Sequence, residues 1–243
     1  MSHTEETFER LLNVGCGHTF HTAWTNIDLV SHSPHVRQYD LRRGLPYAEF
    51  EFDAVYHSHV LEHLTPENAT SMLRDCYRVL RPGGVIRVVV PDLEGVARAY
   101  LSALDAAAGG DSKALANLEW MTLEMIDQMT RQTVGGRMGQ AMRDTSLENH
   151  DFIRQRMGSE MFDQGERPRS RKTLGVRISR LIGSIRKRMA MASVALMEGA
   201  TGLDAYREGR FRQSGEIHRW MYDRVSLPGR LRDVGFVSPR CCR

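Results

Sequence analysis

The chain has 243 residues, of which 41% are hydrophobic and 26% charged, so it can bury the core of one large domain or of a domain with an elaborate insertion. It holds no run of 18 apolar residues that would span a membrane. Its first ten residues, MSHTEETFER, do not have the apolar stretch of a secretory signal. We therefore expect a globular, cytoplasmic protein.

The cysteines and the charge distribution narrow the function classes further. Cys16, Cys76, Cys241 and Cys242 show no paired CxxC spacing, which argues against a zinc site or a disulfide framework and predicts free thiols. The formal net charge of +3 is too small to indicate nucleic-acid binding by itself. Nine Arg or Lys and a single acid lie between residues 166 and 189, so the positive charge is concentrated in one stretch.

Four segments of the first 92 residues have strand patterns. Residues 11–14 (LLNV) form a short apolar run before a glycine turn, and a second strand is expected over residues 24–29. The run FDAVYHSHV from Phe52 is β-rich and turns polar at its end, as a central strand does that delivers side chains to a site. VIRVVV from Val85 predicts a strand that is buried on both faces and ends at Asp92.

Helix signals separate and follow these strands. Thr65 and Pro66 supply an N-cap and a first helical position, and the helix that follows them stops at RPGG, residues 81–84. After Asp92 the pattern becomes mainly helical. The expected elements are helices over residues 93–108, 115–142 and 227–234, and a last strand over residues 235–237.

Strands that alternate with helices through short turns indicate the α/β class. We expect a Rossmann-like, doubly wound and mainly parallel sheet with a large helical insertion before the C-terminal segment. The predicted division is a core over residues 1–92, a helical insertion or lid over 93–215, and a C-terminal part of the core over 216–243.

A glycine turn and two acids suggest a nucleoside site. Gly15 and Gly17 follow the first strand, where backbone N–H groups can approach a ligand that side chains would block. Asp28 ends the second strand and can accept both hydroxyls of a ribose. Asp40 lies where a third strand should end and can accept from an adenine amine. Each acid alone is more often a cap or a solvated turn residue, so the prediction rests on the two acids occurring together, one strand spacing apart.

These segments resemble a known family. LNVGCG, NIDL, DLRRGLP, FDAVYHSHVLEHL and RPGGVIRVVVPD, in this order over residues 11–92, are similar to the successive motifs of class I S-adenosylmethionine-dependent methyltransferases of the type 11-like group. GRFRQSGEIHRWMYD from Gly209, with LPGRLRDVGF after it, resembles the C-terminal part of a subgroup linked to cell-surface polysaccharide biosynthesis.

The resemblance implies S-adenosylmethionine as the cofactor and assigns residues to it. The glycine turn would hold the methionine part, the acid after the second strand the ribose, and the next Asp with its neighbour the adenine. Ser58 and His59, at the end of the strand from Phe52, are added to this set. The expected cofactor-binding residues are Asn13, Gly15, Cys16, Gly17, Asp28, Leu29, Asp40, Leu41, Ser58 and His59.

The chain departs from the family pattern at two places. Thr19 stands where the commoner turn has a third glycine, and only ten residues separate Gly17 from Asp28, so the first crossover should be abbreviated. The family's closing antiparallel hairpin also has little room after Phe236, which suggests a trimmed or divergent C-terminus. A nicotinamide dehydrogenase is disfavoured, because its fingerprint would need a glycine at Phe20 and a later acid.

Histidines at the end of the strand from Phe52 are the catalytic candidates. Transfer of a methyl group to a hydroxyl benefits from a base, and histidine suits neutral pH. We expect His59 at the floor of the active site, whereas His63 can equally be a hydrogen-bonded core histidine. With His57 these make three histidines in seven residues, but no acid-rich partner segment accompanies them, so we expect no metal site.

Two further residues complete the catalytic set. Asp92 ends the strand from Val85 and can orient a sugar hydroxyl or act as a base, with capping of the next helix as its alternative role. His218 lies in EIHRWMY, where Trp, Tyr, His, Arg and Glu are adjacent, as carbohydrate recognition would require. A buried aromatic corner is the alternative interpretation of that segment.

The basic stretch predicts an amphipathic helix. Leu174, Ile178, Leu181, Ile185 and Met189 recur at helical spacing between the Arg and Lys residues of positions 167–188. Such a helix can lie in the interface of an anionic membrane, pack on the core with its charges in water, or bind RNA. No aromatic stacking pattern accompanies the arginines, so we expect no nucleic-acid partner.

We therefore expect an S-adenosylmethionine-dependent methyltransferase that acts on oxygen. The acceptor would be a small molecule or a glycan, such as the sugar hydroxyl of a lipid-linked polysaccharide precursor, and the protein would contact the inner membrane surface peripherally. Two alternatives remain. One is a catalytically degenerate protein that binds cofactor and docks through the basic helix, and the other is an RNA methyltransferase.

Overall fold

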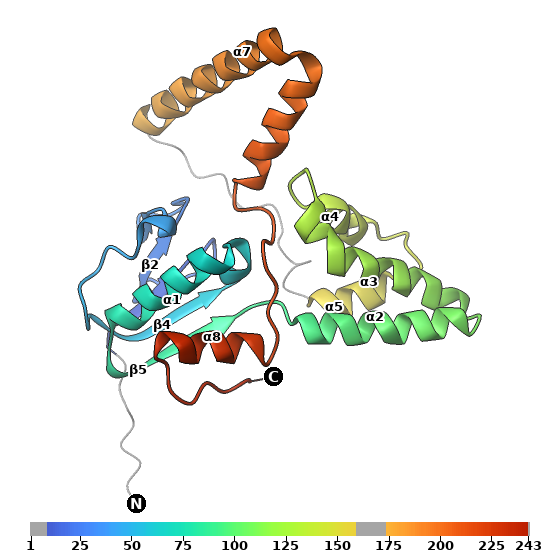
Figure 1. Ribbon diagram of the computed structural model, residues 1–243, viewed down its shortest axis with the longest axis horizontal. Coiled ribbons are helices and arrows are strands. Elements are labelled where there is room, and N and C mark those ends of the chain that lie inside the picture. The colour runs from blue at the N-terminus through green and yellow to red at the C-terminus, as the bar shows by residue number, and fades with distance from the viewer. Residues whose placement is uncertain (1–8, 159–173, 243) are drawn as a thin grey trace, which may run out of the picture. The chain divides into compact units, whose positions relative to one another are not determined.

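The computed structural model describes residues 9–158 and 174–242 (Figure 1). The chain divides into two compact units, one made of residues 1–98 with 218–243 and the other of residues 99–217. The first unit contains a parallel sheet, and the second is helical in the part that the structure describes.

The first unit is built on five strands. They are β1 (Leu11–Val14), β2 (Thr25–Asp28), β3 (Val36–Gln38), β4 (Phe52–Ser58) and β5 (Leu80–Val89). All neighbours pair in parallel, in the order β3-β2-β1-β4-β5. This order, in which the chain reverses direction across the sheet after β3, is that of Rossmann-like folds, whose ligands bind at the carboxyl ends of the strands. The predicted α/β class and parallel sheet are confirmed.

The first crossover is short, as its sequence predicts. Among the described residues no helix separates β1 from β2, and the turn after β1 closes directly onto β2. The backbone N–H groups of Gly15 and Cys16 both donate to the carbonyl of Ile27, over 2.8 and 3.4 Å. The glycine turn is therefore attached to the end of the second strand rather than leading into a long helix.

Helix α1 (Pro66–Val79) packs beside α8 (Ser226–Val234) and covers the sheet with its apolar side (Figure 1). It begins as predicted, with Pro66 in the first turn and the Thr65 hydroxyl accepting from the N–H of Asn68. The buried residues of α1 share one face and join the core below the strands. They are Ala69, Met72, Leu73, Cys76 and Val79.

Two strand expectations are wrong. Residues 235–237 form no strand, because Gly235 and Phe236 cap α8: their N–H groups donate to Arg232 and Leu231, and the Phe236 ring packs edge-to-face on Tyr77. β5 is not buried on both faces either. It lies at the edge of the sheet, and Val85 is 47% exposed.

The second unit contains the remaining helices. They are most of α2 (Leu93–Ala108), then α3 (Ser112–Thr130), α4 (Gly136–Arg143), α5 (His150–Met157) and α7 (Leu174–Arg212). Its buried side chains include Trp120, Met121, Met138 and Ile153. The expectation of one helix over residues 115–142 is wrong, because Gly135 and Gly136, both with positive φ, start a new helix instead.

The long helix α7 contains the described part of the basic stretch. A kink at Gly199, where φ is 68°, divides it into two arms, which Figure 1 shows at an angle to each other. Residues 167–173 of the stretch, and the side chains of residues 174–182, lie outside the described residues. Within the described chain, no helix combines the length and the apolar character needed to cross a bilayer.

The contact between α8 and α1 is testable through Arg230. Its guanidinium donates to the Pro66 carbonyl over 2.9 Å and to the Thr70 hydroxyl over 2.8 Å. Arg230→Ala should lower the free energy of unfolding by about 1–3 kcal/mol, because hydrogen bonds from a charged, half-buried donor are lost. Urea denaturation measures the change. The exposed Arg232→Ala is the matched control and should stay within about 0.5 kcal/mol of the parent; equal losses would contradict the role of Arg230.

Candidate functional site

The turn after β1 has a backbone that only glycine adopts easily. Gly15 and Gly17 have φ values of 67° and 54°, in the left-handed region. A Cβ at Gly15 would lie 2.3 Å from Cγ2 of Val60, whereas a Cβ at Gly17 would meet no atom within 4 Å. The two positions thus require glycine for different reasons. Gly15 lies so close to the segment after β4 that a side chain would not fit, whereas Gly17 needs only the left-handed backbone and leaves open space beside it.

Asp28 joins this turn to the end of β2. One carboxylate oxygen accepts from the N–H of Gly17 over 2.9 Å, and the other accepts from the N–H of Val30 over 2.9 Å. The carbonyl of Asp28 accepts from the N–H of Tyr39 over 2.7 Å, which brings residue 40 to the same edge of the sheet. The structure therefore brings Gly15, Gly17 and Asp28 together, in the order that a nucleoside site requires.

Asp40 is engaged by its own neighbour. Its carboxylate caps the short helix η1 (Leu41–Arg43) and binds the Arg42 guanidinium through contacts of 2.9 and 2.7 Å. The hydrogen bond from Arg42 holds the pKa of Asp40 below its usual value. Its capping role is therefore observed, and its contact with adenine stays a prediction. Leu29 is exposed, and Leu41 packs on the core.

The end of β4 lies beside the glycine turn. Ser58 is the last residue of the strand, and His59 turns away from it with a φ of 54° while its N–H donates to the Val89 carbonyl. Because Val60 follows directly and touches Gly15, the histidine turn and the glycine turn are in contact. His59 is thus placed at the same edge of the sheet as Asp28.

His59 forms a dyad with Glu62. Nδ1 of His59 lies 3.0 Å from Oε1 of Glu62, which is fully buried in η2 (Leu61–His63), while more than half of the histidine side chain is exposed. The hydrogen bond to Glu62 raises the pKa of His59 above its usual value. Burial acts to raise the pKa of Glu62, but the hydrogen bond from His59 and the nearby histidine charges keep it below its usual value. This pairing favours the ionised form of Glu62, which can accept a hydrogen bond from Nδ1–H of His59.

Glu62 is also where the C-terminal segment meets the core. Its backbone carbonyl accepts from the N–H groups of Arg219 and Trp220, over 2.7 and 3.2 Å. The rings of His63 and His218 meet edge-to-face, with centroids 4.8 Å apart. Glu62 is not among the site residues predicted from the sequence. Its position three residues after His59 is the one local feature that could have indicated a pair between the two side chains. His59, His63 and His218, three of the predicted catalytic residues, do converge around it.

The polar cluster contains residue types that also bind metals. Single ligand atoms of Glu62, His63 and His218 lie within 4.8 Å of one another. Zinc bonds of about 2.0–2.2 Å would require the three atoms to approach to roughly 3.4 Å. One oxygen of Glu62 already binds His59. We interpret the cluster as a hydrogen-bonded acid–base group, and a site without metal stays our expectation.

Asp92 acts as a helix cap. Its carboxylate accepts from the N–H of Glu94 over 3.1 Å, at the start of α2. Its backbone forms a parallel bridge with Tyr222, whose carbonyl accepts from the N–H of Leu93 over 2.8 Å. The alternative structural role is therefore observed for Asp92, and a part in catalysis stays a prediction.

Asn13, Cys16 and His57 are buried. Asn13 is buried in β1, opposite Asn26 of β2. Burial, reinforced by the Asp28 charge, raises the pKa of the Cys16 thiol to about 11, so the thiol stays protonated at neutral pH. Burial lowers the pKa of His57 to about 4, which makes this histidine neutral. Neither Cys16 nor His57 is suited to supply charge to the site.

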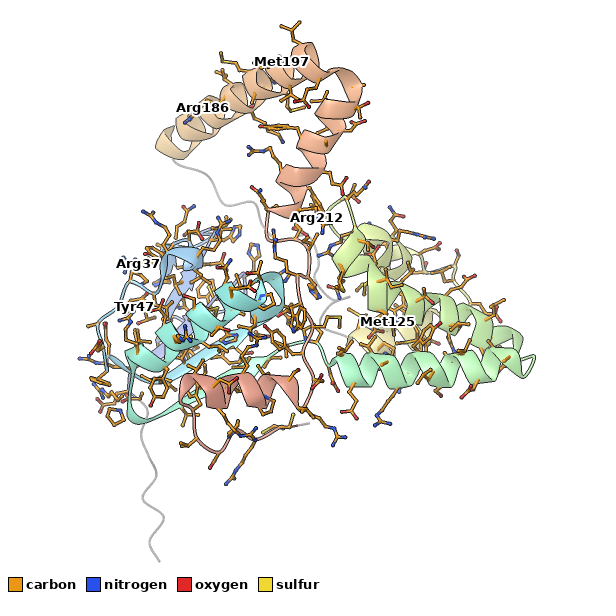
Figure 2. The ribbon with its side chains drawn as sticks, in the orientation of Figure 1. Arg37, Tyr47, Met125, Arg186, Met197 and Arg212 are labelled. Carbon is orange, nitrogen blue, oxygen red and sulfur yellow. The ribbon has the colours of Figure 1, made fainter. Side chains whose placement is uncertain are left out.

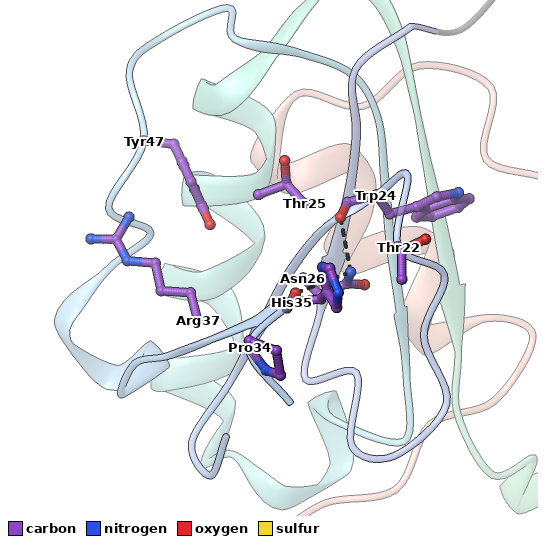
Figure 3. A pocket seen from close by; sticks show the side chains of 8 residues that line it. All are labelled: Thr22, Trp24, Thr25, Asn26, Pro34, His35, Arg37 and Tyr47. Atoms are coloured by element: carbon purple, nitrogen blue, oxygen red, sulfur yellow. Dashed lines mark hydrogen bonds between the residues drawn. The ribbon is translucent and has the colours of Figure 1, made fainter. Parts of the chain in front are cut away.

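An open hollow of about 440 Å³ lies at the amino ends of β2 and β3 (Figure 3). Figure 3 shows the Asn26 side chain, which lines the hollow, donating to the Trp24 carbonyl. Ligands of parallel sheets bind at the carboxyl ends of strands, so we do not assign the cofactor to this hollow. The lining residues are Thr22, Trp24, Thr25, Asn26, Pro34, His35, Arg37 and Tyr47.

The residues at this edge of the sheet lie in a segment that is similar to a known family. Residues 12–88, from β1 into β5, match the family described as the methyltransferase domain. This part of the chain is therefore similar to a methyltransferase domain. The match supports the resemblance to class I S-adenosylmethionine-dependent methyltransferases and covers the glycine turn, Asp28 and the His59–Glu62 dyad.

Two individual proteins are also similar to parts of the chain. Over 49 residues, 20% of the chain, it is 41% identical to an uncharacterised methyltransferase of Synechocystis sp.. The solved structure of the YcgJ protein of Bacillus subtilis covers 40% of the chain at 15% identity and a TM-score of 0.28, too low to add to the description of the fold. The chain spans 23% of the first protein's length and 51% of the second's.

The different environments of the two glycines predict different effects of alanine. Gly17→Ala should cost about 1–2 kcal/mol of stability, the price of a left-handed L-residue in open space. Gly15→Ala adds the clash with Val60 and should cost about 1–3 kcal/mol more. Urea unfolding of both variants measures this. The same loss in both would show that Val60 does not press on the glycine turn.

Proposed function

We propose that the chain is an S-adenosylmethionine-dependent methyltransferase that methylates a hydroxyl oxygen with the His59–Glu62 dyad as the base. The observation that carries the proposal is the contact between Gly15 and Val60. It places the turn that suits the cofactor directly against the turn that holds the histidine. Both turns lie within the segment that matches the methyltransferase domain.

The first half of the site fits the cofactor. Gly17 leaves open space beside its backbone, so a ligand can approach where a side chain would block it. Each oxygen of Asp28 accepts one backbone N–H and keeps a second lone pair, with which it can accept a ribose hydroxyl. When bound, S-adenosylmethionine supplies an electrophilic methyl group on a sulfonium sulfur.

The second half of the site fits proton removal. Ionised Glu62 accepts a hydrogen bond from Nδ1–H of neutral His59, which favours the tautomer whose Nε2 lone pair can accept the proton of a hydroxyl. The hydrogen bond raises the pKa of His59, which strengthens the imidazole as a base. The side chain is more than half exposed, so an acceptor can reach it. Glu62 touches no acceptor and serves as a positioning residue.

The C-terminal segment supports a sugar as the acceptor. The Trp220 side chain is exposed. Its backbone N–H donates to the Glu62 carbonyl, which fixes the position of this residue relative to the dyad. An indole ring beside polar groups suits the apolar face of a sugar ring. Arg219, which is also exposed, can donate hydrogen bonds to the sugar hydroxyls. A sugar hydroxyl of a polysaccharide precursor is thus the acceptor class that we propose, in agreement with the resemblance of residues 209–236.

Asp28 tests the cofactor half. Asp28→Ala should raise the Kd for S-adenosylmethionine at least tenfold, because the ribose loses an ionised hydrogen-bond acceptor. Isothermal titration measures it. Asp53→Ala is the matched control, because Asp53 also accepts two backbone N–H groups, those of Glu9 and Arg10, but at the amino end of β4. Unchanged affinity of the Asp28 variant, or an equal loss in the control, would remove Asp28 from the site.

The dyad predicts a pH dependence. Neutral His59 is the base, so kcat should rise with pH through its raised pKa. Glu62→Gln removes the carboxylate that raises this pKa, so the acid limb of the kcat profile should move to lower pH while kcat falls. His59→Ala should lower kcat by about 10²–10⁴ and leave cofactor affinity near that of the parent. An acid limb at the same pH in the parent and in Glu62→Gln would disprove the dyad.

Release of S-adenosylhomocysteine in the presence of sugar acceptors tests the reaction itself. Turnover that increases with acceptor and is insensitive to salt would support a glycan or small-molecule acceptor. Cofactor binding without turnover on any sugar would favour the catalytically degenerate alternative. Turnover on RNA that falls steeply with salt would replace the sugar acceptor by RNA.

A further inference from the structure

The first arm of α7, defined as residues 174–198, has large aliphatic side chains in water. Ile185, Met189, Leu196 and Met197 are 49%, 66%, 88% and 82% exposed. The spacing of four and seven residues places Ile185, Met189 and Leu196 on one side of the helix. A soluble helix normally buries such a stripe against a core.

The charge of the first arm is mainly positive, and its single acid, Glu198, is its last residue. Its sequence from residue 174 to 197 contains five Arg or Lys and no Asp or Glu. The described basic side chains, Arg186, Lys187 and Arg188, are all exposed, and Figure 2 shows Arg186 and Met197 projecting from this arm. At roughly 100° per residue, Arg186 and Arg188 flank the apolar stripe at about 80° on either side, and Lys187 lies opposite it.

The second arm, residues 200–212, differs in composition. It contains two acids among three arginines, and Arg207 pairs with Asp204 over 3.1 Å. Arg210 lies over the ring of Tyr206, with its guanidinium 5.8 Å from the ring centroid. Arg207 and Arg210 therefore have partners on their own helix, in contrast to the run of three adjacent positive charges at residues 186–188 of the first arm.

We propose that the first arm of α7 docks on an anionic phospholipid surface and lies in the plane of its interface. The stripe of Ile185, Met189 and Leu196 would enter the acyl boundary, and the flanking arginines would extend to the lipid phosphates. The charge is complementary to an anionic leaflet, where each basic residue attracts the surface. Neither arm is apolar enough to cross the bilayer, so the helix lies on it.

An anionic lipid accounts for this helix better than RNA does. RNA phosphates would use the arginines, but they offer nothing to the exposed aliphatic stripe. No aromatic residue lies between residues 174 and 205, so the arm has no side chain on which bases could stack. The apolar stripe matches the acyl chains of a bilayer, and the basic side chains match its anionic headgroups.

Vesicle sedimentation of the full chain tests this docking. We expect binding to vesicles of phosphatidylcholine with phosphatidylglycerol and none to phosphatidylcholine alone. The triple variant Arg186→Gln, Lys187→Gln, Arg188→Gln should lose on the order of a hundredfold in affinity, since each basic residue near the surface contributes severalfold. Met189→Gln with Leu196→Gln should also weaken binding, because the apolar anchor is removed.

The matched control removes the same charge from the second arm. Arg207→Gln, Arg210→Gln, Arg212→Gln should bind anionic vesicles within a few-fold of the parent. No binding by the parent, or an equal loss in this control, would overturn the proposal. Binding to single-stranded RNA in place of vesicles would overturn it too. Titration with S-adenosylmethionine should be unchanged in both triple variants, so this result and that of the proposed activity can fail independently.

Discussion

The candidate site depends on one close approach, that of Gly15 to Val60. A Cβ at position 15 would lie 2.3 Å from the valine methyl, so any side chain there would separate two turns that the sheet brings together. The approach is possible because β1 and β4 are neighbours in a parallel sheet, and their carboxyl ends point the same way. On the other side, the bond from Gly17 to Asp28 ties the same turn to β2. Three strand ends are thereby joined without a helix in the first crossover.

Glu62 extends this constraint to the C-terminal segment. Its side chain orients His59, and its backbone carbonyl accepts from residues 219 and 220, more than 150 positions later in the chain. The bridge between Asp92 and Tyr222 secures the same segment to the end of β5. A buried carboxylate is costly unless it is paired and hydrogen-bonded, so the dyad stabilises the ionised form at the point where the two segments meet. One residue thus links packing to acid–base chemistry.

The regular elements could largely be predicted from the sequence, because their signals are local. The cap and proline at residues 65–66 mark the start of α1, and apolar runs mark β1 and β4. The wrong predictions concern segments whose local sequence pattern is compatible with two different structures. GFV after α8 has the composition of a strand, but Gly235 and Phe236 cap the helix instead. The apolar run from Val85 looks fully buried, and only the position of β5 at the edge of the sheet exposes it.

The chemistry of individual site residues could be predicted less well, because it is set by neighbours and not by residue type. His57 and His59 are two positions apart. Burial keeps His57 neutral with a pKa of about 4, whereas the turn at His59 leaves the strand, meets Glu62 and raises the pKa of the imidazole. Asp28 and Asp40 diverge in the same way, since one holds the glycine turn and the other holds Arg42. The order of such residues indicates where a site lies, and the partner that each one finds on folding decides which of them can act there.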